Sequence, residues 1–192
     1  MMHVKSTIAV LDACVLYSSV VRDFLLRLAQ ARLYEPKWSK AIHDEWTRNL
    51  LNDRPDISRA QLQNTIDHME RHFPQAMVPP VVRGRVDFSL PDADDVHVLQ
   101  SAIACGASVI VTFNLRDFPI HSLKGSGVIA QHPDRFCQEL IRQNSRGALE
   151  AFDRQISGLI NPVMSRDRVL QNLIKSNLVG TAELLNELSR YG

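Results

Sequence analysis

Acidic side chains occur at four separate places in this sequence where a folded chain could bring them together. Asp12 directly follows an apolar run at 8–11, and Asp117 comes soon after a second apolar run at 109–113. Between them lie Glu45, in a segment with helical spacing, and the acids at 92–95. Open parallel sheets bind their ligands outside the carboxyl ends of the strands. The sequence therefore predicts a carboxylate-rich site at one edge of a sheet.

Carboxylates that gather in a folded protein need a positive partner. Two close carboxylates repel each other by about 4 kcal/mol at an effective dielectric constant of about 20. A hard divalent cation offsets this repulsion, and Mg²⁺ or Mn²⁺ suits a set of oxygen ligands with open positions. Such an ion lowers the pKa of a bound water and stabilises negative charge at the group under attack. The acids thus predict hydrolysis by metal-activated water, without a serine, cysteine or histidine nucleophile.

Three segments, taken in order, resemble a known protein family. They are 8–16 (IAVLDACVL), 38–46 (from Trp-Ser to Glu-Trp), and 90–119, which begins LPDADDVHVL and ends TFNLRDFP. In order and spacing these segments are similar to the PIN-domain nucleases, and within them to the VapC-type toxins of bacterial toxin–antitoxin pairs. The resemblance covers about the first three quarters of the chain.

The resemblance implies a role for each acid. The residues that match the family's metal-binding and catalytic acids are Asp12, Glu45, Asp95 and Asp117. Asp92 would be an auxiliary acid at the rim, and Thr112 and Asn114 would hold the carboxylates by hydrogen bonds. Many relatives have aspartate at the position of Asn114. The missing charge leaves open whether one or two ions bind.

Each acid also has a purely structural explanation. Asp12 could be the N-cap of a following helix. Asp92 with Asp95 resembles a capping box, and acids in a first helical turn favour the helix dipole. Glu45 could be a solvated residue on an amphipathic helix, and Asp117 a turn residue. The PIN-like order of all these acids favours the functional interpretation.

Any contact with nucleic acid must come from local clusters of charge. The formal net charge is +1, so the chain has no global field toward RNA or DNA. Three basic residues near the acids could line a phosphate path, or could be ordinary surface charge: Arg83, Arg85 and Arg116. Phosphate contacts of this kind give affinity without base preference. His97, two residues after Asp95, is predicted to be a neighbour of the site rather than a general base.

Strands and helices alternate in the hydrophobic pattern. Apolar runs predict buried strands at 7–11 and 108–112, with further extended segments at 34–38, 78–82 and 128–130. Helical spacing predicts helices at 20–31, 39–51, 58–73 and 92–106, the last with Val96, Leu99 and Ile103 facing inward. This alternation predicts an α/β fold, and the resemblance makes it a PIN-like three-layer sandwich of a parallel sheet flanked by helices.

The sequence predicts only helices from Pro133 onward. The last of these helices go beyond what a minimal PIN domain needs. We therefore expect a PIN-like nuclease domain at 1–144 and a C-terminal helical extension at 145–192. Apolar stripes of this extension, such as the one containing Leu149, Phe152 and Ile156, must be buried against something. The candidates are a protein partner, a second subunit, and the nuclease domain itself.

Composition restricts the class of protein. Hydrophobic residues make up 45% of 192 residues, which predicts a globular protein rather than a disordered one. The three cysteines are far apart, which indicates reduced, buried thiols in a cytosolic protein and not a disulfide scaffold or zinc site. We see no signal peptide, and no apolar run approaches the ~20 residues that span a bilayer. These features predict a cytoplasmic location and no membrane association.

Together, the residues and the resemblance predict a Mg²⁺-dependent (or Mn²⁺-dependent) endoribonuclease. The resemblance further implies a toxin held in check by a cognate antitoxin, and commonly a homodimer. An alternative is a PIN-fold module that binds RNA or protein with weak or no catalysis, suggested by Asn114 and the long helical tail. A third possibility, another Mg²⁺-dependent phosphohydrolase, is disfavoured because its Asp-x-Asp signature is absent: Cys14 stands two residues after Asp12.

Overall fold

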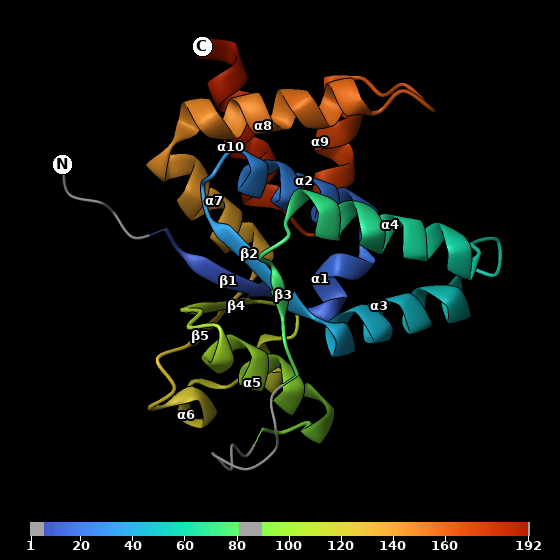
Figure 1. Ribbon diagram of the computed structural model, residues 1–192. Coiled ribbons are helices and arrows are strands. Elements are labelled where there is room, and N and C mark those ends of the chain that lie inside the picture. The colour runs from blue at the N-terminus through green and yellow to red at the C-terminus, as the bar shows by residue number, and fades with distance from the viewer. Residues whose placement is uncertain (1–5, 81–89, 192) are drawn as a thin grey trace. The chain divides into compact units, whose positions relative to one another are not determined.

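Five parallel strands form a sheet within residues 6–80 and 90–191, the part of the chain that this computed structural model describes (Tyr191 by its backbone alone). Their order across the sheet is β3-β2-β1-β4-β5 (Figure 1). The strands are β1 (Ile8–Leu11), β2 (Glu35–Ser39), β3 (Met77–Val78), β4 (Val109–Val111) and β5 (Ile129–Gln131). The predicted α/β fold with a parallel sheet flanked by helices is confirmed. The strand predicted at 78–82 is short, and its residues 81–82 lie outside the described part.

The helices fall into two groups by the compact unit to which they belong. Those in the unit that contains the sheet are α1 (Ala13–Tyr17), α3 (Lys40–Asp53), α4 (Arg59–His72), α5 (Val96–Ala104) and α6 (Ile120–Leu123). The others are α2 (Ser19–Gln30), α7 (Pro133–Gln143), α8 (Ser145–Gly158), α9 (Arg166–Lys175) and α10 (Val179–Tyr191). The C-terminal helices predicted after Pro133 are therefore present.

The central strands are apolar because both of their faces are covered, as is usual for parallel sheets. In β1, the side chains of Ala9, Val10 and Leu11 are fully buried, and β1 pairs with β2 on one side and β4 on the other. Helix α5 packs on β1, β2 and β4. The parallel pairing of β1 with β4 aligns Leu11 with Val111, so the residues that follow these two strands meet.

Helix α5 turns a slightly different face to the sheet than its apolar spacing predicts. Of the three residues expected to face inward, Leu99 is buried, whereas Val96 and Ile103 are half-buried. The other buried apolar residues of α5 are Val98 and Ala102. The buried face of α5 therefore includes Ala102, a small residue that the apolar spacing did not single out.

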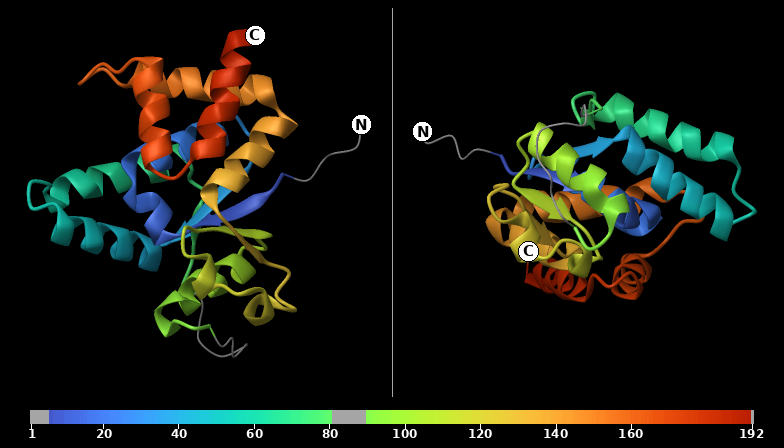
Figure 2. Two further views of the ribbon diagram at one scale, coloured as in Figure 1. Left: turned by 180° about the vertical axis from the view of Figure 1, so that it is seen from behind. Right: turned by 90° about the horizontal axis from the view of Figure 1, so that it is seen from below.

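Helix α3 is anchored in a way that fixes the direction of its other faces. Its N-cap is Ser39, whose hydroxyl accepts a hydrogen bond from the backbone N–H of Ile42 at 3.4 Å. Ile42, Trp46 and Leu50 are buried and recur every four residues, so they form one inward stripe. Helix α4 runs back beside α3 (Figures 1 and 2). With this stripe inside, Glu45 lies on the adjacent face of α3.

The chain divides into two compact units, one of residues 7–17 and 35–131, the other of 1–6, 18–34 and 132–192. The first contains the sheet. In the second, α2 packs against α8, with the rings of Phe24 and Phe152 edge to face at 6.1 Å. The apolar stripe of α8 thus has a partner within its own unit. These units do not coincide with a division at residue 144, and the separate folding of 1–144 and 145–192 stays a prediction.

No helix among residues 6–80 and 90–191 is long and apolar enough to span a membrane.

Candidate active site

The candidate site lies where the order of the sheet reverses. From β1 the sheet continues through β2 on one side and through β4 on the other, and the residues just after β1 and β4 meet there. Asp12 follows β1, and its backbone N–H donates to the carbonyl of Val111 at 3.1 Å. Thr112 follows β4, and its N–H donates to the carbonyl of Gln131 at 3.0 Å. Such reversal points are the usual ligand sites of open α/β sheets.

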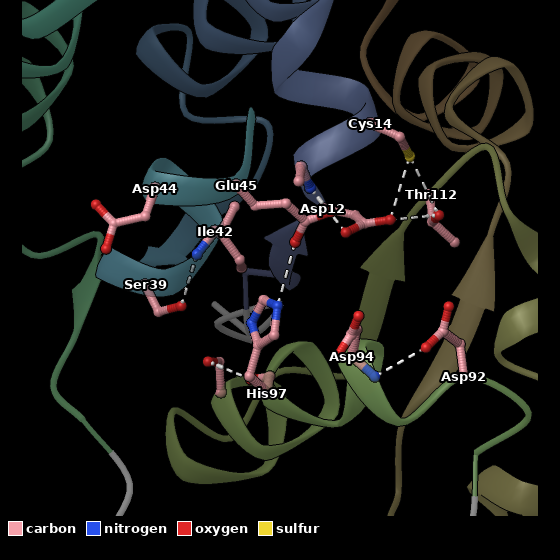
Figure 3. A network of polar contacts seen from close by, with 12 residues as sticks. Asp12, Cys14, Ser39, Ile42, Asp44, Glu45, Asp92, Asp94, His97 and Thr112 are labelled. Carbon is pink, nitrogen blue, oxygen red and sulfur yellow. Dashed lines mark hydrogen bonds and ion pairs between the residues drawn. The ribbon is translucent and has the colours of Figure 1, made fainter. Parts of the chain in front are cut away.

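Asp12 is a buried carboxylate with several hydrogen-bond donors (Figure 3). Its side chain is only 3% exposed. Oδ1 accepts the backbone N–H of Ala13 at 2.7 Å, and Oδ2 accepts the Thr112 hydroxyl at 2.7 Å and the Cys14 thiol at 3.2 Å. Burial raises the pKa of Asp12, and the Glu45 charge adds to this, while the donors act in the opposite direction. These donors therefore hold the carboxylate in one orientation, in an environment where burial disfavours its charged form.

Two backbone groups steer the donors onto Asp12. The N–H of Phe113 donates to the Cys14 sulfur at 3.3 Å, and the N–H of Asn114 donates to the Thr112 hydroxyl oxygen at 2.9 Å. Each acceptor is then left to direct its own hydrogen toward Asp12. Burial, and next the charge of Asp12, raise the pKa of Cys14 to about 12. The thiol therefore stays protonated at neutral pH and can act as a donor.

The structure places Cys14 at the site, whereas the sequence suggested only a reduced, buried thiol. All three cysteines are free, and Cys137 is buried while Cys14 and Cys105 are partly exposed. The available signal was the spacing: Cys14 comes two residues after Asp12, in the first turn of α1. Its contact with the β4 end depends on the pairing of β1 with β4, which spacing alone does not give.

Glu45 projects from α3 toward His97 on α5. Its Oε2 lies 3.2 Å from His97 Nε2, and both side chains are partly exposed. Figure 3 shows the pair beside Asp12. His97 is thus a neighbour of the acids, as the sequence suggested, and its contact with Glu45 fixes the direction of that carboxylate.

Asp92 and Asp95 have different environments. Asp92 caps the short 3-10 turn Ala93–Asp95: its Oδ1 accepts the backbone N–H of Asp94 at 2.9 Å. This is the structural role expected of a capping residue, although the donor is the backbone N–H of Asp94 and not that of Asp95, which donates to the Asp92 carbonyl at 3.4 Å. Asp95 is half-buried, and its pKa is raised to about 7.

The pKa of Asp95 reports how the acids are grouped. Burial is the largest cause of its rise, followed by the negative charges of Asp12, Asp117, Asp92 and Glu45, in that order. Members of all four acidic clusters that the sequence singled out therefore lie close enough to affect this one carboxyl group. Asp117 ends a second 3-10 turn, Leu115–Asp117, and its side chain is 21% exposed. Four chain segments far apart in sequence thus contribute to one field of negative charge.

This donor set fits a hard divalent cation by its chemistry. The acids present only oxygen, and their mutual repulsion is what such a cation would relieve. Among the described residues, however, no three Asp, Glu, His or Cys side chains are placed as ready ligands of one ion. Asp12 is turned toward Thr112 and Cys14, and Glu45 toward His97. Binding of one ion would therefore require these carboxylates to come closer together than they now lie.

The remaining predicted residues are placed around the acids with less definite roles. Asn114 lines a pocket of about 360 Å³. Arg116 is 90% exposed, with its Nε 3.8 Å from Asp117 Oδ1. Arg83 and Arg85 lie outside the described residues. Of the residues expected to support the carboxylates, Thr112 donates to Asp12 directly, while Asn114 acts through its backbone N–H.

Comparison with known families agrees with this geometry. The family model of the PIN domain matches residues 8–116, which is more than half of the chain and includes Asp12, Glu45 and Asp95. The family model of the VapC50 C-terminal domain matches residues 133–187. Asp117 lies one residue beyond the first match. No curated protein and no solved structure matches the chain significantly.

Proposed function

We propose an activity for this chain from the family to which it belongs: it is a member of the PIN-domain family, whose domains are generally nucleases. The proposed activity is hydrolysis of RNA phosphodiester bonds, as an endoribonuclease that requires Mg²⁺ or Mn²⁺. The observation that carries the proposal is the grouping of acids from four chain segments at the reversal point of the sheet, where Asp12, Asp117, Asp92 and Glu45 lie near enough to act on Asp95.

The proposed mechanism assigns a task to each side chain at the site. Asp12, Glu45, Asp95 and Asp117 would hold the ion, which when bound supplies charge neutralisation and activation of water. Thr112 and Cys14 keep Asp12 in one orientation, and His97 does the same for Glu45. Partners of this kind typically change metal affinity or activity by about 10–100-fold. Cys14 is not a nucleophile, because its thiol stays protonated.

Asp12→Asn tests the activity. The substitution keeps the shape of the side chain and removes one charge, so RNA cleavage in Mg²⁺ should fall at least about a hundredfold, the upper end for supporting residues. The fold should remain, as judged by circular dichroism. Asp67→Asn on the exposed face of α4 is the matched control, since the new amide can still accept from Gln63. Cleavage by the Asp12 variant at the unmodified rate would refute the assignment.

We further propose that the chain is the toxin of a toxin–antitoxin pair in the cytoplasm. The match of 133–187 to the VapC50 C-terminal domain supports this role. The C-terminal helices and their connections carry exposed apolar residues that suit a protein contact, namely Ile160, Val163, Ile174 and Val179. An antitoxin is the proposed partner, and a homodimer is a second proposed assembly. Expression of the chain alone should arrest growth, and expression of Asp12→Asn should not.

A PIN-fold binding module with weak or no catalysis is the second candidate. It is favoured by the lack of three ready metal ligands among the described residues, and by an amide at Asn114 where many relatives have an acid. The two candidates differ in one measurement. RNA that binds the unmodified protein in Mg²⁺ or Mn²⁺ and is recovered uncut would support the binding module.

A further inference from the structure

We propose that the groove between α1 and α3 binds the base of a nucleotide next to the cleaved bond of a single-stranded RNA. This inference rests on the proposed function and adds a specificity site to it. The groove has a volume of about 360 Å³. It is large enough for one base with its sugar, and it opens beside the acids.

The groove is continuous with the candidate active site because they share residues. Glu45 and Cys14 line the groove and also belong to the candidate site, where Glu45 contacts His97 and Cys14 donates to Asp12. A nucleotide whose phosphate is held at the acids therefore has its neighbour within reach of the groove. Asn114, which follows β4, borders the groove at the same place.

One face of α3 supplies the polar wall of the groove. Glu45, Asn49 and Asn52 recur at spacings of four and three, which places them along one side of the helix. The amides of Asn49 and Asn52 are exposed, and neither has a hydrogen-bond partner among the described residues. Each amide offers both donors and an acceptor. This is the chemistry that reads the edges of unpaired bases.

Helix α1 supplies the opposite wall. Tyr17 lines the groove, and its hydroxyl donates to Asp53 Oδ2 on α3 at 2.8 Å. This bond fixes the position of the ring, and aromatic rings are common stacking platforms for single-stranded bases. The structure thus combines a fixed ring with free amides in one groove.

The charge of the groove favours a base over a phosphate. Among the described residues that line it, two are carboxylates, Glu45 and Asp53, and none is lysine or arginine. A phosphate would be repelled there, whereas a neutral base would not. The base must also be unpaired, because its edges are otherwise occupied by its complement. A single-stranded RNA segment therefore fits the groove better than a duplex.

The test uses the full chain, with Asn49→Ala and Asn52→Ala as variants and Asn64→Ala, an exposed amide on α4, as the control. Short single-stranded RNAs with randomised nucleotides on both sides of the cut are digested in Mg²⁺, and the cut sites are sequenced. The unmodified protein should prefer some bases at one position beside the cut. Each groove variant should weaken that preference roughly tenfold, as expected for loss of a base-edge contact. The control should keep it.

Two outcomes separate this inference from the proposed function. If the unmodified protein cuts RNA and the groove variants keep both its rate and its base preference, the groove is not a base site. The inference is then wrong, while the proposed function still stands. If the unmodified protein does not cut RNA, the proposed function fails and the inference fails with it. Melting temperatures of the variants, which should equal that of the control, exclude a loss of fold as the cause.

Discussion

Replacement of Asp95 by asparagine should make the metal-free protein more stable at neutral and alkaline pH. The pKa of Asp95 is raised from 3.8 to about 7, first by burial and then by the surrounding carboxylates. The folded protein therefore binds this proton more tightly than the unfolded chain does. Ionisation costs stability, so the free energy of unfolding should fall as pH rises from about 4 to about 7. Asparagine has no proton to lose and removes this fall.

The size of the effect follows from the rise in pKa. For a fully buried group, a rise from 3.8 to about 7 corresponds to about 4 kcal/mol. Asp95 is only half-buried, and solvent screening reduces such interactions strongly. We therefore expect Asp95→Asn to raise the free energy of unfolding by about 1–2 kcal/mol at pH 8, after discount for screening. Near pH 4 the two proteins should be equally stable.

The assay is urea denaturation in a metal chelator at several values of pH between 4 and 8. Asp67→Asn is the control for a surface carboxylate on α4. A second series at pH 8 replaces the chelator with Mg²⁺. An ion at a hundredfold excess over its Kd should stabilise the unmodified protein by about 2.7 kcal/mol, and the variant by less.

If the free energy of unfolding changes with pH in the same way for the unmodified protein and Asp95→Asn, the electrostatic reasoning is refuted. Ionisation of Asp95 would then not be the cause of the loss of stability. Equal stabilisation of both proteins by Mg²⁺ would remove Asp95 from the proposed metal site. The two results are independent, so the grouping of the acids and their role in ion binding are tested separately.

Two further substitutions probe contacts that the structure shows. Cys14→Ala removes a donor to Asp12, so it should lower RNA cleavage and raise the Mg²⁺ concentration for half-maximal activity by about 10–100-fold. Cys14→Ser keeps a donor and should lose less activity. Equal activity of the unmodified protein and both variants would contradict this role of Cys14. Asp134→Ala removes the carboxylate that accepts the first backbone N–H groups of α10, and should lower the free energy of unfolding by about 1–2 kcal/mol in urea denaturation. An unchanged urea midpoint would show that water replaces this cap without loss.

Sequence alone predicted the strands and the edge at which the acids gather. The central strands are short and wholly apolar, and parallel strands place their carboxyl ends together, so Asp12 and Thr112 had to be neighbours once β1 and β4 paired. Helix starts were also predictable, because Ser39 and Ser58 are N-caps with local hydrogen bonds. These features depend on contacts close in sequence or on general rules of sheet topology.

The contacts between helices could not be predicted in the same way. The Glu45–His97 pair joins residues on α3 and α5, and depends on how far each helix is rotated about its axis. Helix α5 shows how small such differences are, since its buried residues are Val98 and Ala102 in addition to Leu99. The grouping of α2 with the C-terminal helices likewise depends on a contact between residues far apart in sequence, the packing of Phe24 on Phe152. Hydrophobic spacing predicts which face of a helix is apolar, but not which element that face packs against.

Structural and functional explanations of the same acid are compatible at this site. Asp92 caps a turn, as its position predicts, and its charge still raises the pKa of Asp95. A cap needs only an acceptor oxygen, which serine or asparagine would supply without the repulsion. The additional charge contributes at most a favourable interaction with the helix dipole of about 0.3–1 kcal/mol, and in the metal-free protein its repulsion of the other acids is a cost. A fold tolerates such a cost most readily where a ligand relieves it, which is why the collective repulsion among these acids, more than the position of any one of them, supports a cation site.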